Sequence, residues 1–343
     1  MTTDRNLRIT LRRRPDGLPG PDDFSVDDAP VPEPSEGEVL ARTLLLSIDP
    51  AMRGWLDEGP NYSQPVAIGD VMRSFGLSEI AQSRLAGFSG GDIVVGMPGW
   101  QEWATLGAGD IYRRVDPELA PLSTALGVLG INGLTAYIGM LEIARPRPGE
   151  TIVVSTAAGA VGSIAGQLAR LQQARVVGLA GSPEKCQLCV EEFGFDACID
   201  YRRVGDLRTA LGQHCPDGID AFFDNVGGDM LDAVLDHINI AARVAICGTI
   251  SLRPGEPARG PRVERRLLIK RAGMQGFLAT DHLERMKPVV AELASYVADG
   301  SLRYREDLAP QLTDAPAALE RLLAGRNTGK SIVRVAEPAR AAR

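Results

Sequence analysis

Strand-like apolar runs alternate with helix-length segments through the second half of the chain. The runs "TIVVS" (151–155) and "RVVGLA" (175–180) are each followed by a helical pattern, at about 161–171 and 183–192. Strands that alternate with helices in this way are typical of a parallel sheet covered on both faces. The pattern therefore predicts a doubly wound α/β domain, whose further strand candidates are "ACID", "IDAFFD", "RVAICG" and "GMQGF" (197–200, 219–224, 243–248 and 273–277).

The first half of the chain has a different texture and reads as β-rich. Pro and Gly clusters separate short strand candidates, "GEVLARTLLLSI", "GDIVVG" and "WQEWATL" (37–48, 91–96 and 100–106). After a long helix expected at about 281–299, "TGKSIVRV" (328–335) is a last strand with no helix behind it. A chain of 343 residues is too long for one ordinary core. We expect residues 1–128, joined by 307–343, to form one domain and residues 129–306 the other.

Composition and charge exclude several classes of function. The chain is 44% hydrophobic and 24% charged, as in a soluble globular protein, and its net charge of −7 argues against nucleic acid as a partner. No stretch approaches the roughly 20 apolar residues that span a bilayer. The arginine-rich start could suggest a transit peptide, but Asp4 interrupts it and "LRITLRRR" alternates as an edge strand would. We expect a cytoplasmic protein that binds neither membranes nor nucleic acids.

Cysteine and histidine are confined to the second half of the chain. The five cysteines are odd in number and lack disulfide spacing, which fits a reducing compartment. Cys186 and Cys189 form a CxxC inside a helical pattern, where two residues one turn apart are the simpler reading than a zinc site. No cysteine and no histidine precedes residue 186. Because zinc sites in proteins favour these two ligands, we expect no metal chemistry in the N-terminal half.

The stretch "VVSTAAGAVGSIAGQLAR" (153–170) resembles a dinucleotide fingerprint that lacks its first glycine. The three glycine places, which serve a tight turn, phosphate approach and helix packing, fall at Ala157, Gly159 and Gly162. Alanine is tolerable at the first place if its φ is negative. The loop follows a strand and opens a helix, whose first N–H groups bind phosphate. The sequence therefore predicts a dinucleotide site.

The end of the second strand indicates which dinucleotide is bound. NAD sites usually carry an acid there for the ribose 2′-hydroxyl, whereas "VVGLAGSPEK" has small residues followed by Lys185. Tyr201 and Arg202 come at the end of the third strand. One charge-assisted hydrogen bond contributes about 1.5–3 kcal/mol, enough to favour a 2′-phosphate. This predicts NADPH, with a solvated helix lysine as the alternative reading of Lys185.

Several motifs together are more specific than the glycine-rich loop. The segment 131–171 resembles the medium-chain dehydrogenase/reductase superfamily, in particular its zinc-free NADPH-dependent alkenal/one oxidoreductases. This branch includes 15-oxoprostaglandin 13-reductases (leukotriene hydroxydehydrogenases) and bacterial curcumin reductases. The matching motifs are "SIDPAMRGWL", "GSPEKC", "FFDNVGG", "AICGTIS" and "RNTGKSIVRV" (47–56, 181–186, 222–228, 245–251 and 326–335). The resemblance implies a Rossmann domain plus a β-rich GroES-like catalytic domain.

The resemblance also implies which residues surround the cofactor. The pyrophosphate would rest on Ala160, Val161 and Gly162. The adenosine 2′-phosphate would be surrounded by Gly181, Lys185 and Tyr201. The ribose and nicotinamide would be reached by the remaining members of the set, which are Thr135, Asn225, Cys247, Gly248, Thr249, Ser251, Phe277, Leu278 and Asn327. Asn225 also reads as a simple turn residue before two glycines.

The activity that the resemblance implies is reduction of a carbon–carbon double bond conjugated to a ketone or aldehyde. NADPH would deliver hydride to the β-carbon, and the resulting enolate would be protonated. Many relatives have a tyrosine just after the "CGTIS" position, and some have one in place of Ala51, but this chain has neither. Tyr62, in "GPNYSQPV", is then the candidate proton donor. A loop tyrosine packed on its neighbours, with the ribose hydroxyl or water as donor, is the alternative.

Two other functions and one assembly remain open from the sequence. An NADPH:quinone oxidoreductase would share the fold and the cofactor. With both expected tyrosines missing, an NADPH-binding protein with weak or no catalysis is a further alternative. Relatives pair through the sheet edge beyond the sixth strand, which is apolar here, and an uncovered edge favours association. We therefore expect a homodimer acting on a small enone or enal.

Overall fold

The computed structural model describes residues 5–59, 63–252 and 259–339. These residues form two compact units. One contains the chain up to Gly127 together with the part from Glu306 onward, and the other is Val128–Arg305. No helix within the described ranges is long and apolar enough to cross a bilayer.

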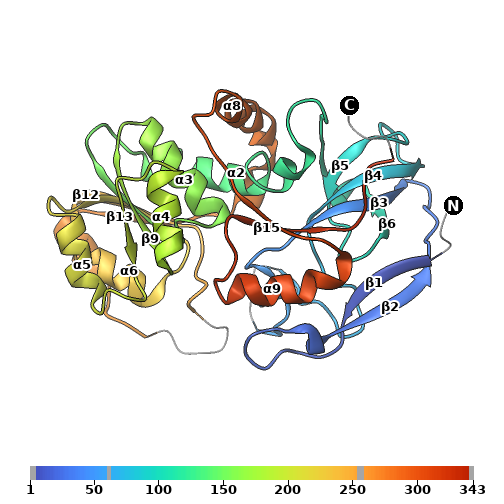
Figure 1. Cartoon of the computed structure of the whole chain (residues 1–343), viewed down its shortest axis with the longest axis horizontal. Coiled ribbons are helices and arrows are strands. Elements are labelled where there is room, and N and C mark those ends of the chain that lie inside the picture. Colours follow the sequence, from blue (N-terminus) through green and yellow to red (C-terminus); the bar gives the residue numbers. More distant parts are fainter. Residues whose placement is uncertain (1–4, 60–62, 253–258, 340–343) are drawn as a thin grey trace. The chain divides into compact units, whose positions relative to one another are not determined.

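The Val128–Arg305 unit is built on a parallel sheet. Among its described residues the sheet has six strands in the order β10-β9-β8-β11-β12-β13 (Figure 1). This order and the intervening helices confirm the predicted doubly wound Rossmann sheet. The strands are β8 (Thr151–Ser155), β9 (Arg175–Ala180), β10 (Ala197–Asp200), β11 (Ile219–Asp224), β12 (Ile238–Ile246) and β13 (Gly273–Gly276).

The short apolar runs became central strands because helices cover both of their faces. Every residue of β8 is buried, and Val153 pairs with Val177 on one side and Phe222 on the other. All three side chains are inaccessible to solvent and belong to one hydrophobic cluster. Continuous burial of this kind is what a parallel sheet requires.

The helices of this unit pack closely on their neighbours. Glycine makes one contact possible, since a Cβ on Gly166 of α3 would lie 1.9 Å from the Phe195 ring. The segment after α2 continues as a π-helical stretch at Ile138–Ala144. The helices are α2 (Ile131–Tyr137), α3 (Ala160–Leu171), α4 (Pro183–Glu191), α5 (Leu207–His214), α6 (Gly228–Leu235), α7 (Glu264–Lys270) and α8 (Met286–Ala298).

Two expected boundaries differ in the structure. The single helix expected at 281–299 is a 3-10 segment, Ala279–Arg285, followed by α8, with a break at His282. Pro288 explains where α8 begins, because proline is tolerated only in the first turn of a helix. Strand β12 starts at Ile238, earlier than expected, and ends before Cys247.

The other unit is strand-rich, as expected for the catalytic domain. Within its described residues one sheet has seven strands: six pair in the order β14-β15-β3-β4-β5-β7, and β6 pairs with the first half of β3. Strands β1 and β2 form a separate antiparallel pair (Figure 1). The strands are β1 (Arg5–Leu11), β2 (Phe24–Pro30), β3 (Glu38–Ser47), β4 (Gly76–Ser83), β5 (Ile93–Gly96), β6 (Trp103–Gly107), β7 (Ile111–Arg114), β14 (Glu306–Ala309) and β15 (Lys330–Arg334).

The C-terminal strand joins this unit, and it does so against β3. Strand β15 pairs antiparallel with β3, and Ile332 lies opposite Ser47. Helix α9 (Ala315–Leu323) connects β14 to β15, and Leu319 packs with Leu46 and Val333 in one hydrophobic cluster. A four-residue helix, α1 (Met52–Trp55), follows β3. The chain therefore leaves the sheet at the "SIDPAMRGW" motif.

Candidate functional site

The loop between β8 and α3 is held in one shape by close backbone packing. Thr156 takes the left-handed conformation with φ 53°, whereas the φ of Ala157 is not positive. A Cβ on Gly162 would lie 2.3 Å from the Thr156 carbonyl oxygen, and one on Gly159 would lie 2.9 Å from Thr156 Cγ2. Alanine therefore fits the first place of the fingerprint, and the two later places have no room for a side chain.

Helix α3 begins with N–H groups available to an anion. Gly159 is its N-cap residue and has no side chain to bond them, and the first intrahelical bond runs from Ser163 N–H to the Gly159 carbonyl at 3.0 Å. The predicted phosphate contacts, Ala160, Val161 and Gly162, make up this first turn. Because a helix N-terminus also carries the positive end of the dipole, the loop and helix fit the pyrophosphate of a dinucleotide.

The carboxyl ends of β9 and β10 bring two of the predicted residues together. The Tyr201 N–H donates to the Ala180 carbonyl at 3.1 Å. A Cβ on Gly181 would lie 3.0 Å from the Tyr201 hydroxyl oxygen and 3.3 Å from Arg202 Nε. The Arg202 guanidinium also lies 5.9 Å from the centre of the Tyr201 ring. This edge of the sheet therefore carries a phenol and a guanidinium, both exposed.

Lys185 lies in the first turn of α4, directly after this strand end. The Ser182 hydroxyl caps the helix and accepts the Lys185 N–H at 3.3 Å. Glu184, in the same turn, is an acid that the sequence reasoning passed over. Hydrogen bonds from its own backbone N–H and from the Ser182 hydroxyl lower the pKa of Glu184. The Glu184 carboxylate is therefore hydrogen-bonded within the first turn of α4.

One buried carboxylate connects three loops at the carboxyl edge of the sheet. Asp224 is the last residue of β11 and has no solvent-accessible surface. Its Oδ1 accepts the Ser155 hydroxyl at 3.2 Å, the Val226 N–H at 2.8 Å and the Gly227 N–H at 3.0 Å. Its carbonyl oxygen accepts the Cys247 N–H at 2.8 Å. Asp224 therefore fixes the ends of β8, β11 and β12 together.

Asn225 continues this network toward the glycine-rich loop. Its side-chain Nδ2 donates to the Ser155 carbonyl at 2.8 Å, and its backbone N–H donates to the Ser155 hydroxyl at 2.7 Å. A Cβ on Gly248 would lie 2.9 Å from the Asn225 carbonyl oxygen. The Asn225 side chain, which the resemblance assigned to the cofactor, therefore also holds the start of the loop.

Burial dominates the electrostatics of this network. It raises the pKa of the Asp224 carboxyl above the usual range, and the hydrogen bonds from Gly227, Val226 and Ser155 oppose it. Burial, together with the nearby Asp224 charge, also raises the pKa of the Cys247 thiol to about 12. A raised pKa disfavours the thiolate and makes this thiol a poor nucleophile.

The segment after β12 packs against the turn after β11. The Ser251 hydroxyl donates to the Val226 carbonyl at 2.6 Å. A Cβ on Gly227 would lie 3.6 Å from Thr249 Cα. The structure thus brings Asn225, Thr249 and Ser251 to neighbouring loops.

Three other predicted residues of this unit are Thr135, Phe277 and Leu278. The Phe277 ring lies 6.4 Å from the Phe223 ring, and a Cβ on Gly139 would lie 2.6 Å from Phe277 Cζ. The Phe277 ring therefore packs against Phe223 and Gly139, while the neighbouring Leu278 is exposed. The Thr135 hydroxyl donates to the Ile131 carbonyl of its own helix at 2.7 Å.

The last two predicted residues belong to the strand-rich part of the chain. Asn327 is buried, and its Nδ2 donates to the Gly329 carbonyl at 3.0 Å. Tyr62, the predicted proton donor, lies outside the described residues. Its role remains a prediction from the sequence.

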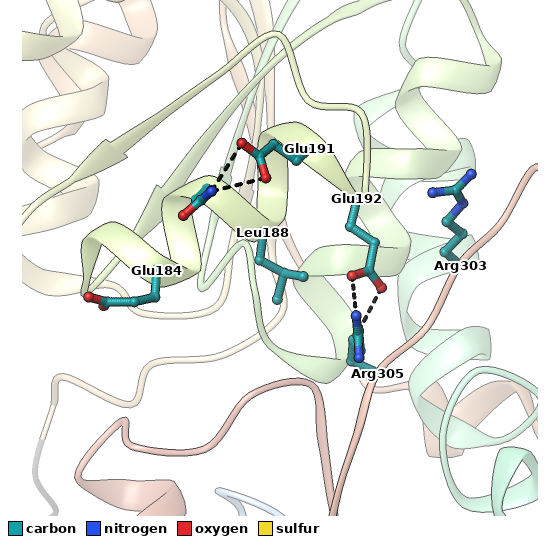
Figure 2. A pocket seen from close by; sticks show the side chains of 7 residues that line it. Glu184, Leu188, Glu191, Glu192, Arg303 and Arg305 are labelled. Atoms are coloured by element: carbon teal, nitrogen blue, oxygen red, sulfur yellow. Dashed lines mark hydrogen bonds and ion pairs between the residues drawn. The ribbon is translucent and has the colours of Figure 1, made fainter.

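A surface pocket of about 580 Å³ lies along the outer face of α4 (Figure 2). The Arg305 guanidinium binds the Glu192 carboxylate at 2.6 and 2.7 Å, and the Gln187 amide binds Glu191. None of the residues that the sequence assigned to a cofactor lines this pocket. The lining residues are Glu184, Gln187, Leu188, Glu191, Glu192, Arg303 and Arg305.

Comparison with known proteins extends these observations over the whole chain. A family model described as the N-terminal domain of oxidoreductase matches residues 7–113, and one described as zinc-binding dehydrogenase matches residues 160–295. The NADPH-dependent curcumin reductase of Escherichia coli is 41% identical over 97% of this chain and 97% of its own length. The 2-alkenal reductase (NADP+-dependent) of Nicotiana tabacum is 38% identical over 96% and 97%.

A solved structure agrees with these relatives. CurA from Vibrio vulnificus in complex with NADPH is 40% identical, with a TM-score of 0.90 over 97% of this chain and all of the other. The chain belongs to the zinc-free branch of the medium-chain dehydrogenase/reductase superfamily. Within that branch it is an oxidoreductase of the enone and alkenal reductase type.

The Rossmann unit of this family member contains two residues that sequence reasoning missed. Ser155 and Asp224 hold together the loops after β8, β11 and β12 but were not assigned a role. The available signals were an acid at the end of a buried strand and a serine at the end of its neighbour, where parallel strands bring side chains to one edge. Both read as ordinary strand ends until the pairing of β8 with β11 is known.

Two substitutions at Asp224 separate its hydrogen bonds from its charge. Asp224→Ala leaves the Val226 and Gly227 N–H groups buried without an acceptor, and should lower the free energy of unfolding by at least about 2 kcal/mol. Asp224→Asn retains Oδ1 and should stay within about 1 kcal/mol of wild type. Urea unfolding at neutral pH measures both. Equal losses in the two variants would contradict the role given to the hydrogen bonds.

The raised pKa of Asp224 also predicts how the stability of wild type, compared with Asp224→Asn, changes with pH. A raised native pKa means that the folded state holds the Asp224 proton more tightly than the unfolded chain does. This contribution to stability is therefore present below about pH 4 and is lost as the pH rises through the native pKa. Asp224→Asn, measured against wild type, should become relatively more stable from pH 4 upward. A difference in stability that does not change with pH would refute this.

Proposed function

We propose that this protein is an NADPH-dependent reductase of carbon–carbon double bonds conjugated to a ketone or aldehyde. The proposal is carried by full-length similarity to two enzymes whose names combine an NADP coenzyme with such substrates, curcumin and a 2-alkenal. Both substrates contain an alkene that is already activated by a carbonyl group. Hydride addition to such an alkene needs no strong Lewis acid, in keeping with a zinc-free enzyme.

The residues of the Rossmann unit would bind the cofactor as follows. The first turn of α3, Ala160–Gly162, would donate N–H groups to the pyrophosphate. Gly181 leaves space beside Tyr201, and Lys185, Tyr201 and Arg202 would supply donors to the 2′-phosphate. The loops joined by Asp224 would receive the ribose and the nicotinamide through Asn225 and the 247–251 segment. When bound, NADPH supplies the hydride for the β-carbon.

The rest of the reaction would depend on positioning and on one proton. The protein must hold the β-carbon at about 3–3.5 Å from the hydride donor and place a hydrogen-bond donor at the carbonyl oxygen. Protonation at the α-carbon completes the reduction. Tyr62 would supply this proton, because a phenol with a pKa near 10 is a neutral donor at physiological pH.

We also propose that the protein is a homodimer that pairs through the β13 edge. Strand β13 ends the sheet of the described residues, and Arg243 of β12 pairs with Gly273. Exposed apolar side chains lie on β12, the strand next to β13, and on α7, which contacts β12. Leu268 of α7 is 77% exposed, and Ile240 of β12 is also exposed. An open strand edge beside apolar side chains favours association with a second copy.

The coenzyme preference provides the first test of this function. Wild type should oxidise NADPH with enones and enals, and kcat/KM for NADPH should exceed that for NADH by roughly tenfold to a hundredfold. Lys185→Met should remove most of this preference, whereas Lys287→Met, an exposed lysine of α8, should leave it unchanged. Turnover with quinones alone would support a quinone oxidoreductase. NADPH binding without turnover would support a binding protein.

The proton donor is tested by removing one hydroxyl. Tyr62→Phe should lower turnover of an enone by at least about tenfold, because a general acid contributes on the order of 10²–10⁴ to the rate. Tyr112→Phe, which removes a hydroxyl from β7 in the same unit, is the matched control. Turnover of Tyr62→Phe within about twofold of wild type would remove Tyr62 from the mechanism.

The assembly is tested by molar mass in solution. Light scattering at micromolar concentration should report the mass of two chains, and Leu268→Lys should shift the protein toward the monomer by placing a charge in the interface. A wild-type monomer under these conditions would refute the dimer.

A further inference from the structure

A buried ion pair lies where two functional motifs of the strand-rich unit leave the sheet. Lys330 Nζ is 2.6 Å from Asp49 Oδ1, and only 4% and 12% of the two side chains are exposed. Nζ also donates to the Ile48 carbonyl at 3.1 Å, and the Ser47 hydroxyl donates to Asp49 Oδ2. Both carboxylate oxygens therefore have partners.

The pair connects two segments at the point where the pairing of β3 with β15 ends. The pairing of β3 with β15 ends at Ser47 opposite Ile332, and one further bond joins Ile48 N–H to the Ser331 carbonyl at 3.1 Å. Beyond this point the first segment turns into α1. Its turn starts from the Asp49 carbonyl, which accepts the Met52 N–H at 3.1 Å. The ion pair is thus the last link before the Ala51–Trp55 turn.

The second segment reaches Lys330 through a tight turn. The Asn327 amide donates to the Gly329 carbonyl, and Gly329 takes a left-handed conformation with φ 70°. Gly127 lies against the lysine stem, since a Cβ there would be 3.5 Å from Lys330 Cγ. Lys330 is therefore confined on both its stem and its charged end, directly after the turn that carries Asn327.

Stability alone does not account for such a pair. Removing two charges from water costs several kcal/mol per ion, and apolar replacement of a buried pair is often neutral or stabilising. What an apolar pair cannot reproduce is the directional set of bonds from Nζ to Asp49 Oδ1 and the Ile48 carbonyl. The pair therefore fixes the positions of the Lys330 and Asp49 backbones more than it stabilises the folded state.

We propose that Lys330 and Asp49 are positioning residues that hold the Ala51–Trp55 turn and the Asn327 turn in register for double-bond reduction. The inference rests on the proposed function, in which these two turns belong to motifs of the enone reductases. Ala51 occupies the place where some relatives have a tyrosine, and Asn327 is a predicted cofactor contact. A shift of about 1 Å between such groups costs up to a hundredfold in rate.

The test replaces the ion pair with an apolar pair of similar volume. Asp49→Leu/Lys330→Met should keep its melting temperature close to that of wild type, while kcat for an enone falls by about tenfold or more. The affinity for NADPH should change by less than about fivefold, since the phosphates bind to the other unit. Arg321→Met/Asp307→Asn removes a more exposed ion pair of the same unit, 2.6 Å long, and should leave all three quantities unchanged.

Each outcome decides the role of the pair. Wild-type kcat in the apolar double variant would overturn the proposal, as would a loss of melting temperature with kcat per folded molecule preserved. If the double variant does not fold, Lys330→Arg provides the second measurement. It keeps the charge but changes the donor geometry beside Gly127, and should lower kcat with little change in melting temperature.

Hydrogen exchange, which does not depend on catalysis, tests this proposal separately from the proposed function. Hydrogen exchange of the amides in 51–56 and 326–329 should be about tenfold faster in the double variant than in wild type, with exchange elsewhere unchanged. Unchanged exchange in these two segments would refute the positioning role. A wild-type enzyme that turns over no enone would instead refute the proposed function, and the exchange result would still decide the role of the pair.

Discussion

The Rossmann unit depends on one buried carboxylate at the end of its fourth strand in chain order. Asp224 accepts hydrogen bonds from the strand before it in the sheet, from the turn after it and, through its carbonyl, from the segment after β12. A buried charge is costly unless it is hydrogen-bonded. These partners cannot separate without leaving that charge unsatisfied. The constraint therefore fixes the loops after β8, β11 and β12 relative to one another at this edge of the sheet.

The two units use the same principle with different chemistry. In the Rossmann unit the absence of a side chain at Gly162 lets the start of α3 pack on the Thr156 backbone, and the Asp224 network holds the neighbouring loops. In the strand-rich unit a buried lysine and aspartate pair where the pairing of β3 with β15 ends, and we propose that they hold the two neighbouring turns. In both units the chemistry would be carried out by groups on loops, while buried polar contacts keep those loops in place.

The elements with strong periodicity were the ones that the sequence predicted well. Six strands alternating with helices led directly to the parallel sheet, because continuous apolar runs such as 151–155, each followed by a helix, are typical of strands covered on both faces. Short polar strands such as β14 gave no signal, and the break at His282 depends on local geometry near Pro288. Ser155 and Asp224 could not be assigned, since their importance arises only when neighbouring strands align. The contacts of Lys330 with Asp49 join residues that are 281 positions apart, and no local pattern reveals them.

The central claim is that hydride is added to an activated alkene rather than to its carbonyl group. The most direct test uses NADPH that carries deuterium at the transferred position of the nicotinamide, with a simple enone as substrate and mass spectrometry and NMR of the product. The account predicts a saturated ketone with deuterium on the β-carbon. Deuterium on the carbonyl carbon, in an allylic alcohol, would contradict it.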